Sequence, residues 1–328
     1  MTKSITWEKG RWLGMHFGHV LITGGAGFVG SQLLKRLEPI SDHIYVIDDL
    51  SSGRHEAVVD SKKVTFYQES YTNEDFLEEV LPRVEWVFHL ACSSLTHSVL
   101  DMRKDFHTNL FGAFLLLEKT KALCPSLKRM VYTSTASVYG NASVRPTPES
   151  FYHISTPYSA SKFSAEHYFQ VYSHMYNMPI TMLRLSNVFG PGQLITNPYC
   201  GVVAKFFDAV EKKEPISIYG DGTQSRDFSY IEDVIDAILI AASHKDSIGK
   251  LYNIGSGIET SVQQLAAHIS TVAGFIDYPT VSLPKRVIDN VHHRSVNNSL
   301  IKKELQWAPR HTLRQGLEET YNWLKKKG

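Results

Sequence analysis

Cysteine, long apolar runs and an excess of charge of either sign are all scarce in this chain of 328 residues. Three cysteines cannot build a disulfide framework, and their scarcity indicates a reducing compartment, which predicts a cytoplasmic protein. The 34 Lys and Arg residues against 33 Asp and Glu leave a net charge of +1, so we expect no nucleic acid partner. The longest apolar stretch, Phe111–Leu117, is too short to span a bilayer. Residues 1–19 contain no apolar signal-peptide core, so we expect no membrane partner either.

Short apolar runs alternate with helical patterns through the first half of the chain. Strands are predicted at His19–Thr23, His43–Ile47, Val64–Phe66, Val84–Leu90, Arg129–Thr133 and Ile180–Leu185. Helices are predicted between them at Ser31–Leu37, Asn73–Leu81, Phe106–Lys121 and Ser159–Tyr176. This alternation is typical of βαβ units, in which helices cover both faces of a parallel sheet. The expected fold class is therefore α/β, with a doubly wound parallel sheet of the Rossmann type.

The pattern changes beyond residue 185, where Gly, Pro and Asn interrupt the chain more often. Helices remain at Asp233–Ser243, Ser261–Ala273 and Leu313–Lys325, but strict alternation stops. We expect a larger domain over residues 1–185, joined by a returning segment near 229–257. A smaller C-terminal substrate-binding lobe is expected over residues 186–328, with a substrate cleft between the two.

A glycine-rich turn follows the first predicted strand and opens the first predicted helix. Gly24, Gly27 and Gly30 let the backbone turn tightly and approach a pyrophosphate at the helix N-terminus. The second predicted strand ends at Asp48, 24 positions after Gly24, about where an acid binds a ribose 2′-hydroxyl. Because such an acid repels a 2′-phosphate, the pattern favours NAD over NADP, although Arg54 lies near enough to receive one.

Tyr158 and Lys162 are four residues apart, so they are neighbours on one helical face. They follow the hydroxyl-rich segment 133–140, which ends a predicted strand at the edge where doubly wound sheets bind ligands. A tyrosine has a pKa of about 10. We expect the Lys162 ammonium, together with a positive nicotinamide ring, to lower it so that the phenolate can act as a base. Tyr321 and Lys325 repeat the spacing on a charged C-terminal helix, where we expect no catalytic role.

Together with His89-Leu-Ala91, Asn109, Thr135 and Asn187-Val-Phe-Gly-Pro-Gly192, these motifs resemble the extended short-chain dehydrogenase/reductase family. Within it they are similar to the NAD-dependent nucleotide-sugar epimerase/dehydratase branch. The resemblance implies three catalytic residues, Thr135, Tyr158 and Lys162. It implies NAD binding by Gly24, Gly27, Phe28, Val29, Asp48, Asp49, Glu69, Ser70, Leu90, Ala91, Asn109, Tyr158 and Lys162. It implies nucleotide-sugar binding by Thr135, Asn187, Arg226, Arg286, Asp289 and Arg294.

Positions 136 and 137 distinguish the reactions of this branch. The branch's dehydratases and decarboxylases resemble Thr-Asp-Glu and Thr-Ser-Glu, whereas this chain has Thr135-Ala-Ser137, close to the Ser-Ala-Thr of its 4-epimerases. We therefore expect C4 epimerisation through transient oxidation to a 4-keto sugar, with Tyr158 as the base. Five alternatives remain: a 4-keto-sugar reductase, a C3/C5 epimerase, a decarboxylase, a dehydratase and a non-catalytic dinucleotide-binding protein.

Arg294, if it faces the hexose, would favour a carboxylate such as that of a uronic acid. His89, Cys92 and His97 lack the second half of a metal site, so no metal is expected. The family usually forms dimers through two helices per subunit, which implies a homodimer here. The stripe Phe106, Leu110, Phe114 and Leu117 would serve that contact or pack on the sheet.

Overall fold

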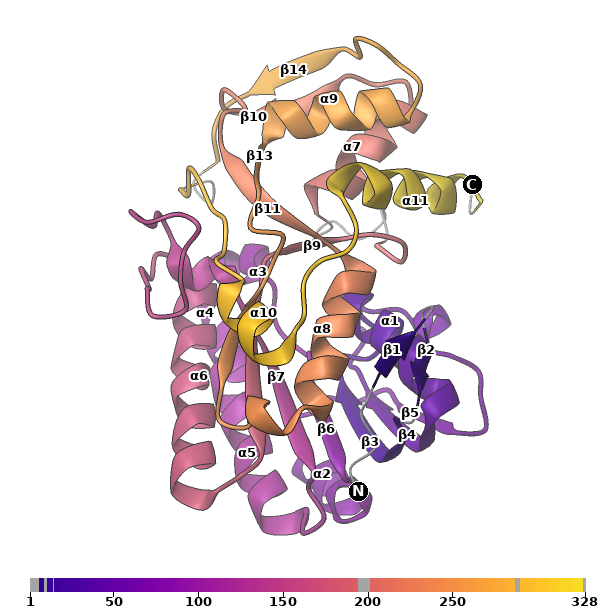
Figure 1. Cartoon of the computed structure of the whole chain (residues 1–328), viewed down its shortest axis with the longest axis vertical. Helices are drawn as coiled ribbons and strands as arrows, with labels where there is room; N and C mark the ends of the chain where they lie inside the picture. The colour runs from indigo at the N-terminus through magenta and orange to yellow at the C-terminus, as the bar shows by residue number, and fades with distance from the viewer. Residues whose placement is uncertain (1–5, 9–10, 14, 194–200, 287–289, 327–328) are drawn as a thin grey trace.

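A parallel sheet of seven strands forms the base of the molecule in the computed structural model (Figure 1). The structure describes residues 6–8, 11–13, 15–193, 201–286 and 290–326. The strand order is β12-β8-β7-β6-β3-β4-β5. The strands are β3 (Phe17–Thr23), β4 (Ser41–Ile47), β5 (Val64–Tyr67), β6 (Trp86–His89), β7 (Arg129–Thr135), β8 (Ile180–Leu185) and β12 (Leu251–Ile254). Every adjacent pair is parallel, which confirms the predicted doubly wound α/β fold.

Helices cover both faces of this sheet because its strands are apolar on both sides. In β3, Val20 and Ile22 pack with α1 (Phe28–Leu37) and α8 (Ile231–Ser243). Leu21 points to the other face, where α2 (Glu74–Val80), α5 (Gly112–Leu123) and α6 (Pro157–Tyr176) pack. Side chains alternate between the faces of a strand, so each strand contributes to two cores.

The second lobe lies above the carboxyl ends of the strands (Figure 1). It contains a sheet of β13 (Glu259–Ser261), β11 (Ser225–Tyr230) and β9 (Asn187–Phe189), and a parallel pair of β10 (Ile216–Tyr219) and β14 (Thr280–Leu283). Its helices are α7 (Val202–Glu211), α9 (Val262–Val272) and α11 (Leu313–Lys325). The short helix α10 (Ser299–Leu305) packs back near β12, and β1 (Thr6–Glu8) pairs with β2 (Arg11–Leu13).

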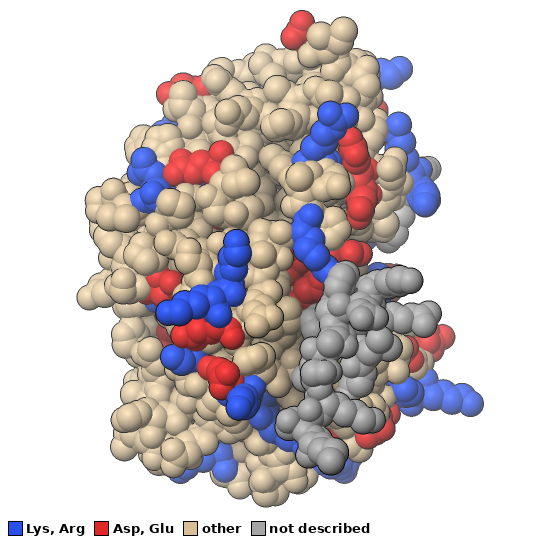
Figure 2. All heavy atoms as spheres, in the orientation of Figure 1, with Lys and Arg blue, Asp and Glu red and all other residues tan. Residues whose placement is uncertain are grey.

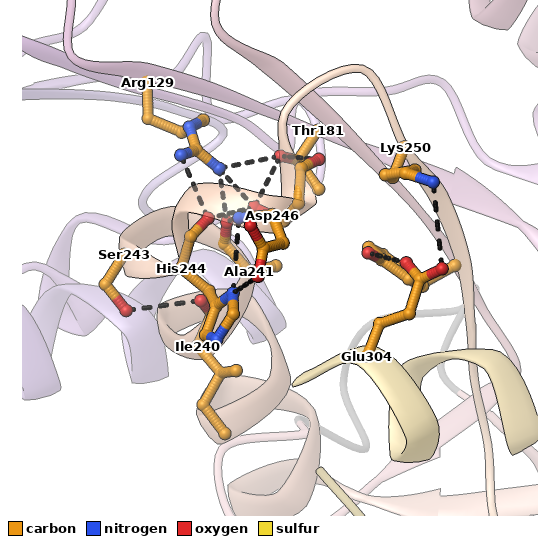
Figure 3. A network of polar contacts seen from close by, with 11 residues as sticks. Arg129, Thr181, Ile240, Ala241, Ser243, His244, Asp246, Lys250 and Glu304 are labelled. Atoms are coloured by element: carbon orange, nitrogen blue, oxygen red, sulfur yellow. Dashed lines mark hydrogen bonds and ion pairs between the residues drawn. The ribbon is translucent and has the colours of Figure 1, made fainter. Parts of the chain in front are cut away.

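Arg129, at the start of β7, joins the sheet to the end of α8 (Figure 3). Its guanidinium donates to the carbonyl of Ala241 at 2.8 Å, the carbonyl of His244 at 3.1 Å and the hydroxyl of Thr181 at 3.0 Å. The last carbonyls of a helix have no intrahelical donor, and a cation there also complements the helix dipole. Burial lowers the pKa of Arg129 to about 10, so it stays charged at neutral pH and holds α8 against the sheet.

The helix predicted over 106–121 is instead interrupted. Phe106–Phe111 forms a π-helical segment between α4 (Met102–Asp105) and α5. Asn109, within this segment, accepts from the backbone N–H of Ser93 at 2.7 Å and donates to its carbonyl at 3.0 Å. This tertiary contact, which no helical periodicity reports, accompanies the local departure from α-helical geometry.

The charged side chains are mixed on the face of the molecule in Figure 2. Lys and Arg lie among Asp and Glu there, as a net charge of +1 leads one to expect. Within the described residues, no helix is both long enough and apolar enough to cross a membrane.

Candidate active site

Two cavities lie at the carboxyl ends of the central strands, where ligands bind in open α/β sheets. The smaller, of about 240 Å³, lies beside the glycine turn and the ends of β4 and β6. The larger, of about 650 Å³, lies between β7, α6 and the second lobe. Cys92, which follows β6, lines both cavities. A ligand in one cavity is therefore adjacent to a ligand in the other.

The glycine turn forms the floor of the smaller cavity. Gly24 has a φ of +74°, and a Cβ there would lie 2.6 Å from the backbone nitrogen of Ala91. At Gly27, the residue preceding α1, the nearest atom to an added Cβ would be the carbonyl oxygen of Gly24 at 3.2 Å. Gly27 lines the cavity, and among the described residues no side chain caps the first N–H groups of α1. This cradle fits a pyrophosphate, which those N–H groups can bind.

Asp48, at the end of β4, lies 9% exposed beside this turn. One carboxylate oxygen accepts from the N–H of Ala26 at 3.0 Å, and the other accepts from the N–H of Leu50 at 2.9 Å. Burial raises the pKa of Asp48, while these backbone donors lower it. Each oxygen keeps acceptor capacity toward the cavity, which suits a ribose hydroxyl and disfavours a phosphate.

Most of the predicted cofactor residues line the smaller cavity, whereas four, Glu69, Asn109, Tyr158 and Lys162, do not. Those in the wall are Gly24, Gly27, Phe28, Val29, Asp48, Asp49, Ser70, Leu90 and Ala91. Glu69 is exposed and its carboxylate accepts from the N–H of Ser70 at 2.9 Å. The side chain of Asn109 bonds to the backbone of Ser93 and to Asp105, so it positions the loop after β6 from behind.

Sequence reasoning missed other residues in this wall. They are Ser51, Ser52, Tyr71, Cys92, Ser93, His97, Lys104 and Thr108. A signal existed for Ser51 and Ser52, because small hydroxyl residues directly follow the acid at the end of β4. The others come from loops and short helices that only the fold brings to the sheet edge.

Thr135 and Tyr158 meet at the inner end of the larger cavity. Thr135 ends β7, and its hydroxyl oxygen accepts from the N–H of Ser137 at 3.1 Å, which leaves its proton free to donate. Tyr158 lies in the first turn of α6, whose N-terminus is capped by the side chain of Thr156. The hydroxyl of Thr135 lies within hydrogen-bonding reach of the Tyr158 hydroxyl.

Lys162 lies one turn after Tyr158 and is only 2% exposed. Its ammonium lies 4.2 Å from the centroid of the Tyr132 ring. Burial lowers the pKa of Lys162, while Glu166 and Asp105 act in the opposite direction. The lysine is therefore held behind the tyrosine, within the protein and close to two carboxylates.

The protein's own side chains do not by themselves lower the pKa of Tyr158. Burial raises the pKa of Tyr158 well above its ordinary value, and the adjacent Cys92 thiol raises it further. Thr135 lowers it by donating a hydrogen bond, but this effect is smaller than that of burial. A phenolate at this position lacks the water that stabilises it in solution.

The predicted substrate residues lie around the larger cavity. Asn187, Arg226, Arg286 and Arg294 all line it, whereas Asp289 falls outside the described residues. Arg226, on β11, donates to the carbonyl of Ser225 at 2.7 Å, and the exposed Arg286 lies 4.3 Å from the ring centroid of Tyr219. Lining residues that sequence reasoning missed include Ser155, Tyr219, Gln224 and Asn290, which carry no local signal.

His89, considered above as a metal ligand, is part of the core. It is 1% exposed, its Nδ1 lies 2.7 Å from the Thr23 hydroxyl, and its ring stacks on Tyr132. Burial lowers its pKa well below the usual value. Over the described ranges, which omit four internal gaps and both termini, no group of three possible ligands could hold a metal.

Fold and cavities together define a class, that of enzymes that bind a dinucleotide at the carboxyl ends of a parallel sheet. More narrowly, the chain belongs to the NAD dependent epimerase/dehydratase family, whose sequence profile matches residues 20–255. Its cofactor is accordingly NAD, which agrees with the glycine cradle and with Asp48.

Relatives in this family catalyse more than one reaction. UDP-glucose 4-epimerase of Mycolicibacterium smegmatis is 32% identical, over 94% of this chain and 98% of that protein. UDP-glucuronic acid decarboxylase 1 of Arabidopsis thaliana is 30% identical, over 91% of this chain and 68% of that protein. The crystal structure of UDP-glucose 4-epimerase from Thermotoga maritima with UDP-glucose has a TM-score of 0.88 and 33% identity, and the match covers 94% of this chain and 99% of that one.

Proposed function

We propose that this chain is an NAD-dependent nucleotide-sugar 4-epimerase. The observation that carries the proposal is the pairing of the Thr135 and Tyr158 hydroxyls with no carboxyl group at the two positions after Thr135. Elimination of water from a sugar requires an additional acid and base. The described acids that line the cavity, Asp208 and Glu214, come from α7 and the turn after it, away from the strand and helix that carry the two hydroxyls.

Each residue has a role in this proposal. Arg226 and Asn187 bind the diphosphate, since a guanidinium fork matches phosphate oxygens. Tyr158 takes the proton of the C4 hydroxyl and later returns it, while Thr135 donates a hydrogen bond to the reacting oxygen. Lys162 stabilises the phenolate, and NAD, when bound, supplies reversible hydride transfer. The cavity of about 650 Å³ gives the hexose room to turn about its diphosphate and present the other face of C4.

Proton NMR in D2O tests this function with UDP-, GDP-, CDP- and dTDP-sugars and no added cofactor. We expect a C4-inverted product without deuterium, because the hydride stays within the enzyme. Deuterium at C3 or C5 would indicate carbon-acid chemistry instead. Turnover that requires added reduced cofactor would indicate a 4-keto-sugar reductase, and release of CO2 would indicate a decarboxylase. Tyr158→Phe serves as the inactive control.

A further inference from the structure

Arg294 brings a buried cation to the larger cavity, in the part that Thr135, Ser137 and Tyr158 line, which we call the catalytic end. It is 8% exposed and lines the cavity, although it lies far along the chain from the other catalytic-end residues. Its Nη1 donates a long hydrogen bond of 3.4 Å to the hydroxyl of Ser137. Ser137 lies two residues after Thr135, in the 3₁₀ turn that follows β7. The guanidinium is therefore beside the residues that would surround the hexose.

The guanidinium is poorly satisfied by the protein. Within the described ranges its Nε has no hydrogen-bond partner, and no Asp or Glu lies within ion-pair distance of it. Burial and the nearby charge of Arg226 lower the pKa of Arg294 to about 9, which still leaves it charged at neutral pH. A buried charge without a counter-charge is costly, which points to a partner supplied from outside the chain.

Two more polar groups of the same cavity lack partners. The Ser155 hydroxyl and the side-chain oxygen of Asn290 are buried without a hydrogen-bond partner among the described residues. These two residues are adjacent, since the Asn290 amide donates to the Ser155 carbonyl at 3.3 Å. A polar ligand with hydroxyl groups would satisfy these atoms, but neither can neutralise a cation. The uncompensated charge in this part of the cavity is that of Arg294.

We propose that Arg294 makes the cavity selective for nucleotide sugars whose hexose carries a carboxylate. The proposal rests on the nucleotide-sugar function proposed above and specifies its substrate class. A carboxylate supplies the missing counter-charge and matches the guanidinium fork with two parallel hydrogen bonds, whereas a neutral hydroxyl does neither. The diphosphate is a less suitable partner, because Arg226 faces it from β11 while Arg294 reaches inward to Ser137.

Binding measured by calorimetry tests the proposal without turnover. The protein is the NAD-loaded Tyr158→Phe variant, and the ligands are UDP, UDP-glucose, UDP-glucuronic acid and UDP-N-acetylmuramic acid. We expect one acidic sugar to bind about 10- to 100-fold more tightly than UDP-glucose, as a charge-assisted hydrogen-bonded pair provides. The two acidic ligands distinguish a carboxylate at C6 from one on an ether substituent.

Adding Arg294→Gln should remove this preference and leave the affinity for UDP within about twofold. Arg226→Gln is the matched control, because loss of a diphosphate ligand should weaken all four ligands equally. If Arg294→Gln also weakens all four equally, Arg294 binds phosphate and the proposal is wrong. Absence of an acid preference in the unsubstituted cavity, while UDP binds, overturns it as well.

A second readout separates a binding role from a structural one. Ligand-free Arg294→Gln should melt no lower than the parent, because the substitution removes a buried cation that has no counter-charge. A large decrease in Tm would indicate a structural role and contradict the proposal. An acid preference combined with a product other than the C4 epimer would overturn the epimerase function alone and leave the role of Arg294 standing.

Discussion

Tyr158 shares its surroundings with Cys92 and Thr135, and the two neighbours act on it in opposite directions. Cys92 raises the pKa of the phenol by charge repulsion, whereas the threonine hydroxyl lowers it by donating a hydrogen bond. Burial exceeds both effects. The residue that we propose as the base therefore depends on its partners to ionise, and single substitutions around it should change its pH dependence.

Replacing Tyr158 with Phe should lower kcat by about 10²–10⁴-fold, because positioned proton transfer contributes about that much. The affinity for NAD should change little, since the glycine cradle and Asp48 remain. Single-turnover kinetics and NAD titration measure the two effects. Tyr321→Phe is the matched control, because Tyr321 pairs with Lys325 at the same spacing on α11, where Lys325 lies 4.2 Å from its ring. A similar decrease in both variants would contradict the assignment.

Replacing Cys92 with Ala should shift the acidic limb of the pH–rate profile to lower pH. A base is active when deprotonated, so the rate rises with pH through the pKa of Tyr158. Cys92 raises this pKa by charge repulsion, so removing it should lower the midpoint. The measurement is kcat/KM against pH for both proteins, with Cys124→Ala, a buried cysteine remote from both cavities, as the control. An unchanged or raised midpoint in Cys92→Ala would refute this account.

At the scale of elements, α6 carries Tyr158 and Lys162 and is held to the sheet by an ion pair. Glu166, one turn after Lys162, binds Arg184 of β8 at 2.7 Å, and both side chains are almost fully buried. The guanidinium also donates to the Tyr139 hydroxyl at 3.0 Å and the Glu149 carbonyl at 2.8 Å. This network fixes the rotation of α6, and with it the direction of its catalytic face.

Glu166→Gln should destabilise the protein by about 3–5 kcal/mol, because it leaves Arg184 buried without its counter-charge. Urea unfolding measures the change in free energy of unfolding. The control is Glu318→Gln, which removes an exposed pair with Arg314 at 2.8 Å on α11 and should cost less than about 1 kcal/mol. Equal losses in the two variants would mean that the buried pair has no special role in the fold.

At the scale of the whole molecule, the apolar stripe predicted over residues 106–117 is partly buried and partly exposed. Leu117 is fully buried against the sheet, whereas Phe106 is 51% exposed. Other large apolar side chains are exposed nearby, on α6 and the segment before α5. They are Met102, Phe111, Tyr168, Val171, Met175 and Tyr176. Contiguous exposed apolar surface marks an interaction site, and we propose that these two neighbouring helices form a homodimer interface.

Light scattering coupled to size-exclusion chromatography should therefore give twice the chain mass of 37.1 kDa. Charges placed in a dimer interface lack counter-charges when buried, so Phe106→Glu combined with Val171→Glu should give monomers. Ile276→Glu, at a 95% exposed position of the second lobe, is the control and should remain dimeric. A monomeric parent protein would refute the proposal.

Local pattern was enough to predict six strands of the central sheet, the glycine cradle and the Tyr158–Lys162 pair. Period-2 and period-3.6 patterns and glycine requirements act over a few residues, so they are readable without the fold. Glu69 and Asn109, which were predicted to bind the cofactor, instead bond to the backbone of Ser70 and Ser93. No local sequence pattern indicates these hydrogen bonds. The π-helical segment was missed for the same reason.

The sequence by itself determined the class of fold and the chemistry of its most local motifs. Only the tertiary structure decided that Cys92 lies beside Tyr158 and that Arg294 lies beside Ser137, 157 positions away along the chain. It also decided the direction in which the protein's own groups shift the Tyr158 pKa, because burial outweighs the hydrogen bond from Thr135. Burial and long-range contact depend on the packing of segments far apart in the chain, which spacing along the sequence does not encode.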